Sequence, residues 1–338
     1  MQEPRGNLSE FEIIERFFTR RASAPAAHSG TRLGVGDDAA LLTVPTGCEL
    51  VAAIDTLVAG HHFLPDAAPR AIAHRALAVN LSDMAAMGAT PAWALLALTL
   101  PQAESAWLGE FSAGWFELAD RHGVDLVGGD TTRGPLTVSV QILGYVQQGT
   151  ALRRSGGCEG DYIVVTGSLG DAGAGLALAA GRQVPGMPSA AVLTNPEAIA
   201  ALRSRFEYPV PRLAFGREAR GIASAAMDIS DGLSGDLPKL AQASGLAAHV
   251  ELERLPLSDA LLSVATPVQA REWALSAGDD YELLMTVPRT RHERLRELAA
   301  RLELRLTVIG ELRAGHGVTW SMDGAVISDA GKGFDHFR

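Results

Sequence analysis

The run that decides the fold is ALAVNLSDMAAMGATPAWALLALTLP, residues 76–101. Its first part belongs to an apolar helical pattern that begins at Pro69, a residue favoured in the first turn of a helix, and continues to about residue 87. Its second part, residues 91–100, is apolar almost throughout, as in strands that are buried on both faces. A long helix followed by such a strand predicts an α/β fold.

Similar patterns surround this run in the first part of the chain. A capping box formed by Ser9 and Glu12 predicts a helix to about residue 21. Residues 136–146 alternate between apolar and polar, as a half-buried strand does. The other predicted elements here are a strand at 49–55, a helix at 104–122 and a strand at 125–127.

A change in composition near residues 147–160, which are rich in Gly, Arg and Gln, predicts a boundary between two domains, 1–148 and 149–338. Two domains are also the natural expectation for 338 residues. Beyond the boundary, the mixture of strands and helices resumes. The predicted strands are 162–166, 225–229, 249–252, 283–287 and 304–309, and the predicted helices are 172–180, 211–222, 231–243 and 289–301.

Acidic motifs carry most of the chemical information, and most of them stand where an apolar stretch stops. They are GDD at 36–38, IDT at 54–56, NLSD at 80–83, GGD at 128–130, DISDG at 228–232 and GDDYE at 278–282. Read alone, any one of them is an ordinary turn. Together they indicate carboxylates that converge in a cleft, where a hard cation must offset their repulsion. Because Mg²⁺ commonly binds one or two carboxylates plus substrate phosphates, the pattern predicts a magnesium site for phosphorylated ligands.

Composition excludes several other classes of function. The chain has 29 basic and 39 acidic residues, a net charge of −10, which disfavours a nucleic-acid-binding surface. Cys48 and Cys158 are too few for a disulfide framework, so a reducing cytoplasm is expected. The sequence lacks the features of a signal peptide or a membrane span, so no membrane partner is expected. Lys239 and Lys332 lie outside any P-loop pattern, so metal ions and arginines would have to neutralise a polyphosphate.

Three further patterns have two readings each. The glycine-rich run 167–173, before a predicted helix, suits a phosphate cradle or a plain turn. Arg153 and Arg154 suit a phosphate clamp or a solvated surface. His61 and His62 have no cysteine or third histidine nearby, which favours a neutral hydrogen-bonding role over a transition-metal site. Acyl transfer has little support, because no Gly-x-Ser-x-Gly elbow is present.

A set of segments occurs in the order seen in the bacterial thiamine-monophosphate kinase family. They are GVGDDAALL, DTLVAGHHF, the run quoted above, LVGGDTTRGPL, RSGGCEGD, MDISDGLSGDL, AGDDYELLMTVP and GKGFDHF. The chain resembles this family from about residue 10 to residue 337. The run through Asp83 and the DTLVAGHHF segment are the most specific, whereas GDD and DISDG are shared with the wider aminoimidazole ribonucleotide synthetase-like superfamily.

The resemblance implies ATP-dependent phosphorylation of thiamine monophosphate to thiamine diphosphate, the last step of thiamine diphosphate biosynthesis. It implies a two-domain α/β (α+β) fold and a homodimer in which the N-terminal sheets of two subunits pair into a β-barrel. The implied Mg²⁺ ligands are Asp38, Asp55, Asp83, Asp130, Asp228 and Asp231. The implied ATP contacts are Gly129, Asp130, Arg154 and Ser230, and the implied thiamine monophosphate contacts are His62, Asp279 and Phe334.

The chemistry implied by the resemblance needs little covalent help from the protein. An acceptor phosphate is already ionised at neutral pH, so no general base is expected, and positioning and charge neutralisation dominate. Metal-bound Asp55, Asp83 and Asp130 would carry direct in-line transfer without a phosphoenzyme.

The chain departs from the family at the predicted acceptor contacts and before Asp55. Asp279 stands where Glu is usual, Phe334 where Tyr is common, and Ala53-Ile54 where Ser-Thr is common. Other readings also stay open. They are another synthetase of the superfamily, a non-catalytic sensor of nucleotide or thiamine phosphate, and a Mg²⁺-dependent phosphohydrolase. Selenophosphate synthetase is disfavoured, because its reactive Cys-Lys pair has no counterpart here.

Overall fold

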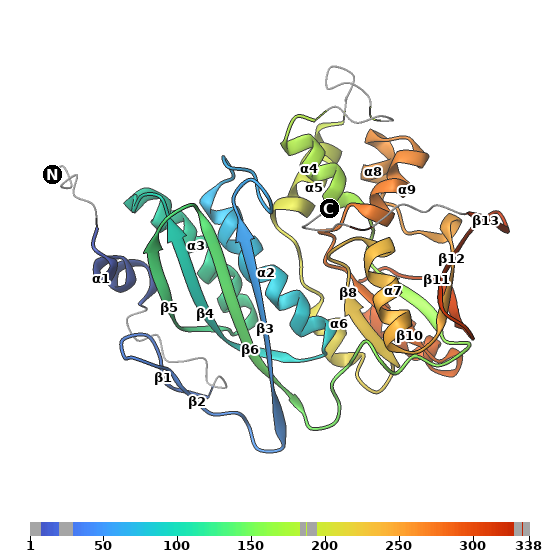
Figure 1. The fold of residues 1–338 in the computed structure, drawn as a ribbon, viewed down its shortest axis with the longest axis horizontal. Coiled ribbons are helices and arrows are strands. Elements are labelled where there is room, and N and C mark those ends of the chain that lie inside the picture. Colours follow the sequence, from blue (N-terminus) through green and yellow to red (C-terminus); the bar gives the residue numbers. More distant parts are fainter. Residues whose placement is uncertain (1–7, 20–29, 183–186, 188–194, 328–332, 334–338) are drawn as a thin grey trace. The chain divides into compact units, whose positions relative to one another are not determined.

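The computed structural model describes residues 8–19, 30–182, 187, 195–327 and 333 (Figure 1). The chain forms two compact units, Met1–Met84 with Thr90–Gln148, and Ala85–Ala89 with Gly149–Arg338. Among the described residues, no helix combines the length and the apolar character needed to cross a bilayer.

The first unit is built on a four-stranded sheet with the order β3-β6-β4-β5, in which only β4 and β5 are parallel neighbours. Helices α2 and α3 cover one face of this sheet (Figure 1). The elements of this unit are α1 (Glu10–Ile13), η1 (Ile14–Phe18), β1 (Thr31–Leu33), β2 (Leu41–Leu42), β3 (Cys48–Val58), α2 (Pro69–Ala86), β4 (Thr90–Leu100), α3 (Ser105–His122), β5 (Asp125–Arg133) and β6 (Thr137–Gln147).

Local sequence accounts for much of this unit. The Ser9–Glu12 capping box is present, with the Glu12 carboxylate accepting from the Ser9 N–H at 2.8 Å. Strand β6 alternates between buried and half-buried residues, as its pattern predicted. Two predicted strands are longer than expected: β3 continues past residue 55, and β5 continues through Gly-Gly-Asp to residue 133. Asp55 and Asp130 therefore lie inside strands, and the prediction that they mark strand ends is wrong.

The second unit contains a seven-stranded sheet with the order β13-β12-β9-β11-β7-β10-β8, antiparallel except between β9 and β12. Its strands are β7 (Tyr162–Thr166), β8 (Ala225–Asp228), β9 (Ala247–Glu251), β10 (Leu283–Val287), β11 (Leu306–Arg313), β12 (Gly317–Met322) and β13 (Ala325–Ile327). Its helices are α4 (Asp171–Ala179), α5 (Pro196–Glu207), α6 (Leu213–Glu218), α7 (Leu233–Ala243), α8 (Asp259–Val264), α9 (Pro267–Ser276) and α10 (His292–Arg301), with short 3₁₀ turns η2 (Leu252–Arg254) and η3 (Arg289–Arg291).

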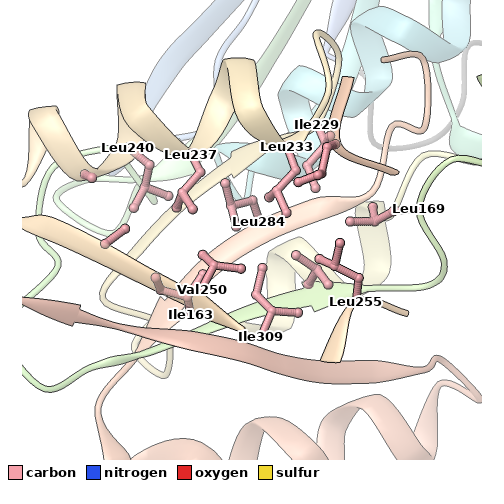
Figure 2. Close-up of a cluster of buried hydrophobic side chains, with 14 of the residues drawn as sticks. Ile163, Leu169, Ile229, Leu233, Leu237, Leu240, Val250, Leu255, Leu284 and Ile309 are labelled. Carbon is pink, nitrogen blue, oxygen red and sulfur yellow. The ribbon is translucent and has the colours of Figure 1, made fainter. Parts of the chain in front are cut away.

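Helix α7 packs on the second sheet through one apolar stripe (Figure 2). Leu233, Leu237 and Leu240 recur at helical spacing and are fully buried. They meet sheet residues that include Ile163 and Leu284. Burying each leucine contributes roughly 1.5–3 kcal/mol. This packing fixes the helix directly after the DISDG motif, and so fixes the motif itself.

Candidate functional site

A cavity of about 780 Å³ lies on the first unit, and two of the acidic motifs contribute to its lining. Asp37 and Asp38 come from the first motif, and Gly129 and Asp130 from β5. Apolar side chains of α1 and η1 line another side: Phe11, Ile14 and Phe18. We call this the N-terminal cavity. Its lining combines acidic residues with apolar side chains, which suits a ligand that has both polar and apolar groups.

Gly129 lets strand β5 present Asp130 at this cavity. Its φ is +152°, and a Cβ there would stand 1.8 Å from the carbonyl oxygen of Leu96 on β4. No other residue allows the two strands to approach so closely. Asp130 is the next residue, paired in register with Ala97, and its side chain is exposed.

Asp55 does not line the N-terminal cavity, whereas its neighbour Ile54 does. Successive residues of a strand point to opposite faces, so Asp55 faces away from the surface on which Ile54 is exposed. It is half-buried there, and burial raises the pKa of its carboxyl. Asp83 is also half-buried, on helix α2.

The predicted metal ligands are divided between the two units. Asp38, Asp55, Asp83 and Asp130 belong to the first, and Asp228 and Asp231 to the second. Across residues 8–19, 30–182, 187, 195–327 and 333, no three His, Cys, Asp or Glu side chains form a group that could hold a metal ion. The carboxylates that line the N-terminal cavity (Asp37, Asp38 and Asp130) still fit the oxygen donor set of Mg²⁺, which takes its other ligands from phosphates and water.

His62 lies in the turn after β3. Its Nδ1 accepts a hydrogen bond from the N–H of Val58 at 3.0 Å. An accepting Nδ1 carries no proton, so this contact agrees with the neutral histidine that the sequence favoured.

In the second unit, the motifs DISDG and GDDYE lie side by side. The N–H of Asp279 donates to the carbonyl of Ser230 at 2.8 Å, and the N–H of Tyr281 to that of Ile229 at 2.9 Å. Asp228 ends strand β8, where it is buried. Predicted ligands of ATP, metal and acceptor substrate are therefore neighbours here, although their motifs are far apart in sequence.

Asp236 and Lys239 hold the DISDG loop in place. The buried Asp236 carboxylate accepts from the N–H groups of Ser230 (3.0 Å) and Asp231 (2.9 Å). Lys239 Nζ lies 2.6 Å from Asp231 Oδ2 and 2.9 Å from Asp236 Oδ1. Burial raises the pKa of Asp236, although Lys239 and the N–H of Asp231 act in the opposite direction. Asp231, a predicted metal ligand, is thus paired with an ammonium group.

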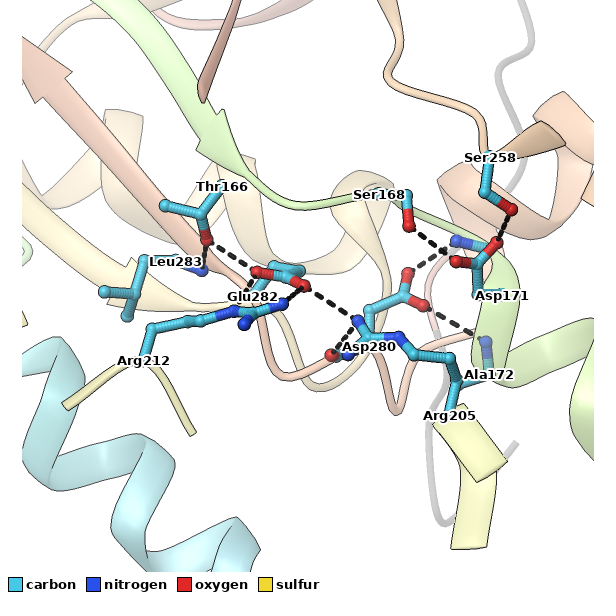
Figure 3. A network of polar contacts seen from close by, with 11 residues as sticks. Thr166, Ser168, Asp171, Ala172, Arg205, Arg212, Ser258, Asp280, Glu282 and Leu283 are labelled. Atoms are coloured by element: carbon cyan, nitrogen blue, oxygen red, sulfur yellow. Dashed lines mark hydrogen bonds and ion pairs between the residues drawn. The ribbon is translucent and has the colours of Figure 1, made fainter. Parts of the chain in front are cut away.

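The glycine-rich run 167–173 is a turn in which backbone N–H groups donate to a carboxyl group of the protein. Asp280 accepts from the N–H of Gly170 at 2.7 Å and from that of Ala172 at 3.3 Å (Figure 3). This carboxyl group occupies the N-terminus of α4, where a phosphate would have to bind. The phosphate-cradle reading is therefore wrong, and the turn reading holds.

Two predicted contacts remain. Arg154 is exposed, and its carbonyl accepts from the Ser244 hydroxyl at 3.0 Å, which fixes the backbone that carries the guanidinium. Phe334 lies outside the described residues. Gly333 packs against the DISDG motif, since a Cβ on Gly333 would stand 2.9 Å from the carbonyl oxygen of Asp231.

Sequence reasoning missed a buried ionic cluster beside the GDDYE motif. Glu282 is fully buried and is bound by Arg205 and Arg212 (Figure 3). The one signal in the sequence was a Glu at the start of the apolar strand YELLMTV, where a charge needs a partner. Helix α5, which carries Arg205, was not predicted, and nothing in the predicted helix 211–222 indicated that Arg212 would bind a buried carboxylate.

Comparison with known proteins identifies the family. Residues 36–146 match the family AIR synthase related protein, N-terminal domain, and residues 159–322 match its C-terminal domain. The chain is 45% identical over 330 residues to the thiamine-monophosphate kinase of Salmonella typhimurium, covering 97% of this chain and 98% of that one. The chain belongs to the thiamine-monophosphate kinase family.

Solved structures of this family share the fold. The thiamine-monophosphate kinase of Stenotrophomonas maltophilia K279a matches with a TM-score of 0.81 and 44% identity, over 89% of this chain and 93% of that one. AaThiL complexed with AMPPCP and TMP matches with a TM-score of 0.74 and 32% identity, over 87% and 89%. The predicted family and two-domain α/β fold are confirmed.

Proposed function

We propose that this chain is an ATP-dependent kinase that converts thiamine monophosphate to thiamine diphosphate, in the cytoplasm. The observation that carries the proposal is near-full-length identity of 45% to the Salmonella thiamine-monophosphate kinase. The fold match to AaThiL complexed with AMPPCP and TMP supports ATP and thiamine monophosphate as the substrates.

The N-terminal cavity supplies a binding surface for phosphates. At this cavity, Asp38 and Asp130 would hold Mg²⁺, which would neutralise the phosphates. Asp55, Asp83, Asp228 and Asp231, which do not line the cavity, are the proposed ligands of further Mg²⁺ ions. Gly129 allows β5 to approach β4 closely, directly before Asp130. The proposed ATP contacts are Gly129, Asp130, Arg154 and Ser230. His62, Asp279 and Phe334 are the proposed contacts of thiamine monophosphate.

The proposed reaction is a direct in-line transfer of the γ-phosphoryl group from ATP to the phosphate of thiamine monophosphate. The acceptor oxygen is ionised at neutral pH, so no side chain has to remove a proton. Incubation with γ-labelled ATP alone should leave no label on the protein. Stable labelling would instead show a phosphoenzyme.

We also propose that residues 1–148 and 149–338 are the two domains of the chain.

We propose further that the protein is a homodimer joined through the first sheet. Strand β3 is an edge strand, and Leu50 and Ile54 on it are 55% and 65% exposed. Exposed apolar residues on a long edge strand invite pairing with another copy. Ile54→Lys should convert the dimer to a monomer in analytical ultracentrifugation, whereas wild-type protein that sediments as a monomer would contradict the proposal.

The direct test is an assay with Mg-ATP and thiamine monophosphate, in which thiamine diphosphate is read by fluorescence after oxidation. Free thiamine serves as the control acceptor. Product from the monophosphate alone supports the kinase. Free phosphate without thiamine diphosphate would indicate a hydrolase, and no consumption of ATP would indicate a sensor.

A further inference from the structure

The carboxylate of Glu282 is fully buried and accepts from four donor groups (Figure 3). Oε1 is bound by Arg205 Nη2 at 2.7 Å and by Arg212 Nη2. Oε2 accepts from Arg212 Nε at 2.7 Å and from the Thr166 hydroxyl at 2.7 Å. Burial alone would raise its pKa, but the hydrogen bonds and charges of Arg212 and Arg205 hold the pKa of Glu282 below its ordinary value.

The surrounding chain is shaped around this carboxylate. Arg205 comes from α5, Arg212 from the residue that precedes α6, and Thr166 from the end of β7. Gly167 has a φ of +61°, and a Cβ there would stand 2.0 Å from Glu282 Oε1. Any side chain at residue 167 would therefore displace the carboxylate of Glu282.

The turn before Glu282 has an unfavourable backbone. Gly278, Asp279 and Tyr281 have φ values of +68°, +62° and +49°. Residues with a side chain adopt this left-handed region only where the surrounding structure imposes it. Asp279, the proposed acceptor contact, is one of these residues, so its direction depends on what holds the turn.

Glu282 is the point at which this turn is fixed to the body of the second unit. Its carbonyl accepts from the N–H of Ile229 at 2.9 Å, which begins the pairing between the two motifs. Its side chain ties the same residue to α5 and to the residue before α6. A shift of Glu282 would be transmitted directly to Tyr281 and Asp279.

We infer that Glu282, clamped by Arg205 and Arg212, is a positioning residue that sets the direction of Asp279 toward the acceptor substrate. This inference rests on the proposed function, because it takes Asp279 as a contact of thiamine monophosphate. The clamp does not touch substrate; it acts through the turn.

Glu282→Gln tests the inference, because it keeps the shape of the side chain and removes its charge. Glu218→Gln is the matched control, since Glu218 pairs with Arg301 on the surface of the same unit. We expect Glu282→Gln to raise KM for thiamine monophosphate about 10- to 100-fold, with KM for ATP nearly unchanged. Hydrogen exchange should become faster at the amides of Asp279 and Tyr281. The control should change none of these quantities.

An unchanged KM for thiamine monophosphate together with unchanged exchange would overturn the inference, as would a fall in kcat alone. If Glu282→Gln does not fold, Arg212→Lys replaces it, because lysine keeps the charge but loses the two-point contact. The same split between the two KM values is then expected, and its absence overturns the inference. Wild-type protein that makes no thiamine diphosphate would refute the proposed function instead, while the exchange measurement would still report on the clamp.

Discussion

The carboxyl group of Asp280 accepts a hydrogen bond from the backbone N–H of Gly170 at 2.7 Å. A residue of the GDDYE turn thereby closes the N-terminus of α4, which lies more than a hundred positions earlier in the chain. Asp280 is 2% exposed, and burial raises its pKa to about 8. This carboxyl therefore keeps its proton at neutral pH in the folded protein, whereas it is ionised in the unfolded chain.

The first prediction follows from that difference. Between about pH 4 and pH 8, the folded state holds a proton that the unfolded state has lost, so the contribution of Asp280 to the free energy of unfolding falls as pH rises. The slope is at most about 1.4 kcal/mol per pH unit. The free energy of unfolding should be measured by urea unfolding at pH 5 and pH 7.5. From the lower to the higher pH, it should fall less in Asp280→Asn than in wild type. Equal slopes would count against a protonated Asp280.

The second prediction concerns Asp83. Asp83→Asn should lower kcat by about 100-fold or more, because a proposed metal ligand stabilises charge mainly during transfer. Binding of thiamine monophosphate should weaken much less. Steady-state kinetics and calorimetry separate the two effects, with Asp66→Asn at an exposed position as the control. Equal losses in turnover and binding would contradict a metal role.

The third prediction concerns Gly129. A Cβ at this residue would stand 1.8 Å from the Leu96 carbonyl oxygen, and backbone cannot yield as a flexible side chain can. Gly129→Ala should lower the free energy of unfolding by about 3 kcal/mol or more. Gly128→Ala is the control, because its closest contact is a leucine methyl group at 3.1 Å. Thermal unfolding gives the melting temperature of both variants. Similar values would contradict the close approach of β5 to β4 at Gly129.

The fourth prediction concerns Lys239. Lys239→Met leaves the buried Asp236 and its neighbour Asp231 without a cation, so the free energy of unfolding should fall by about 1–3 kcal/mol. Arg296→Met, which breaks a solvent-exposed pair with Glu293, should change the free energy of unfolding much less. Chemical denaturation measures both, and equal effects would show that the buried acid does not depend on Lys239.

The fifth prediction concerns ligands. Mg²⁺ with a non-hydrolysable ATP analogue should raise the melting temperature, because ligands that bind only the folded state stabilise it, by about 2.7 kcal/mol at 100 times Kd. The shift should be reduced in Asp130→Asn and retained in Asp66→Asn. No shift at millimolar Mg²⁺ would contradict the proposed site at the N-terminal cavity.

Local patterns predicted elements that short apolar runs mark clearly in the sequence. The strands predicted at 162–166 and 283–287 have the predicted bounds in the structure, as Tyr162–Thr166 and Leu283–Val287. Helix α5 and the pair α8 and α9 were not predicted. Their apolar residues meet one another in a small separate core, so the pattern of each helix alone is weak.

By itself, the sequence determined the α/β class, the acidic motifs and the family, because periodicity, turn residues and motif order are local properties. Only the tertiary structure decided which acidic side chains form hydrogen bonds or ion pairs within the protein and which line a cavity. Asp130 lies at the N-terminal cavity and Asp55 does not, while Asp280 caps a helix and Glu282 binds two arginines. The physical reason is that a buried polar or charged group needs a partner, and folding brings that partner from a distant part of the chain.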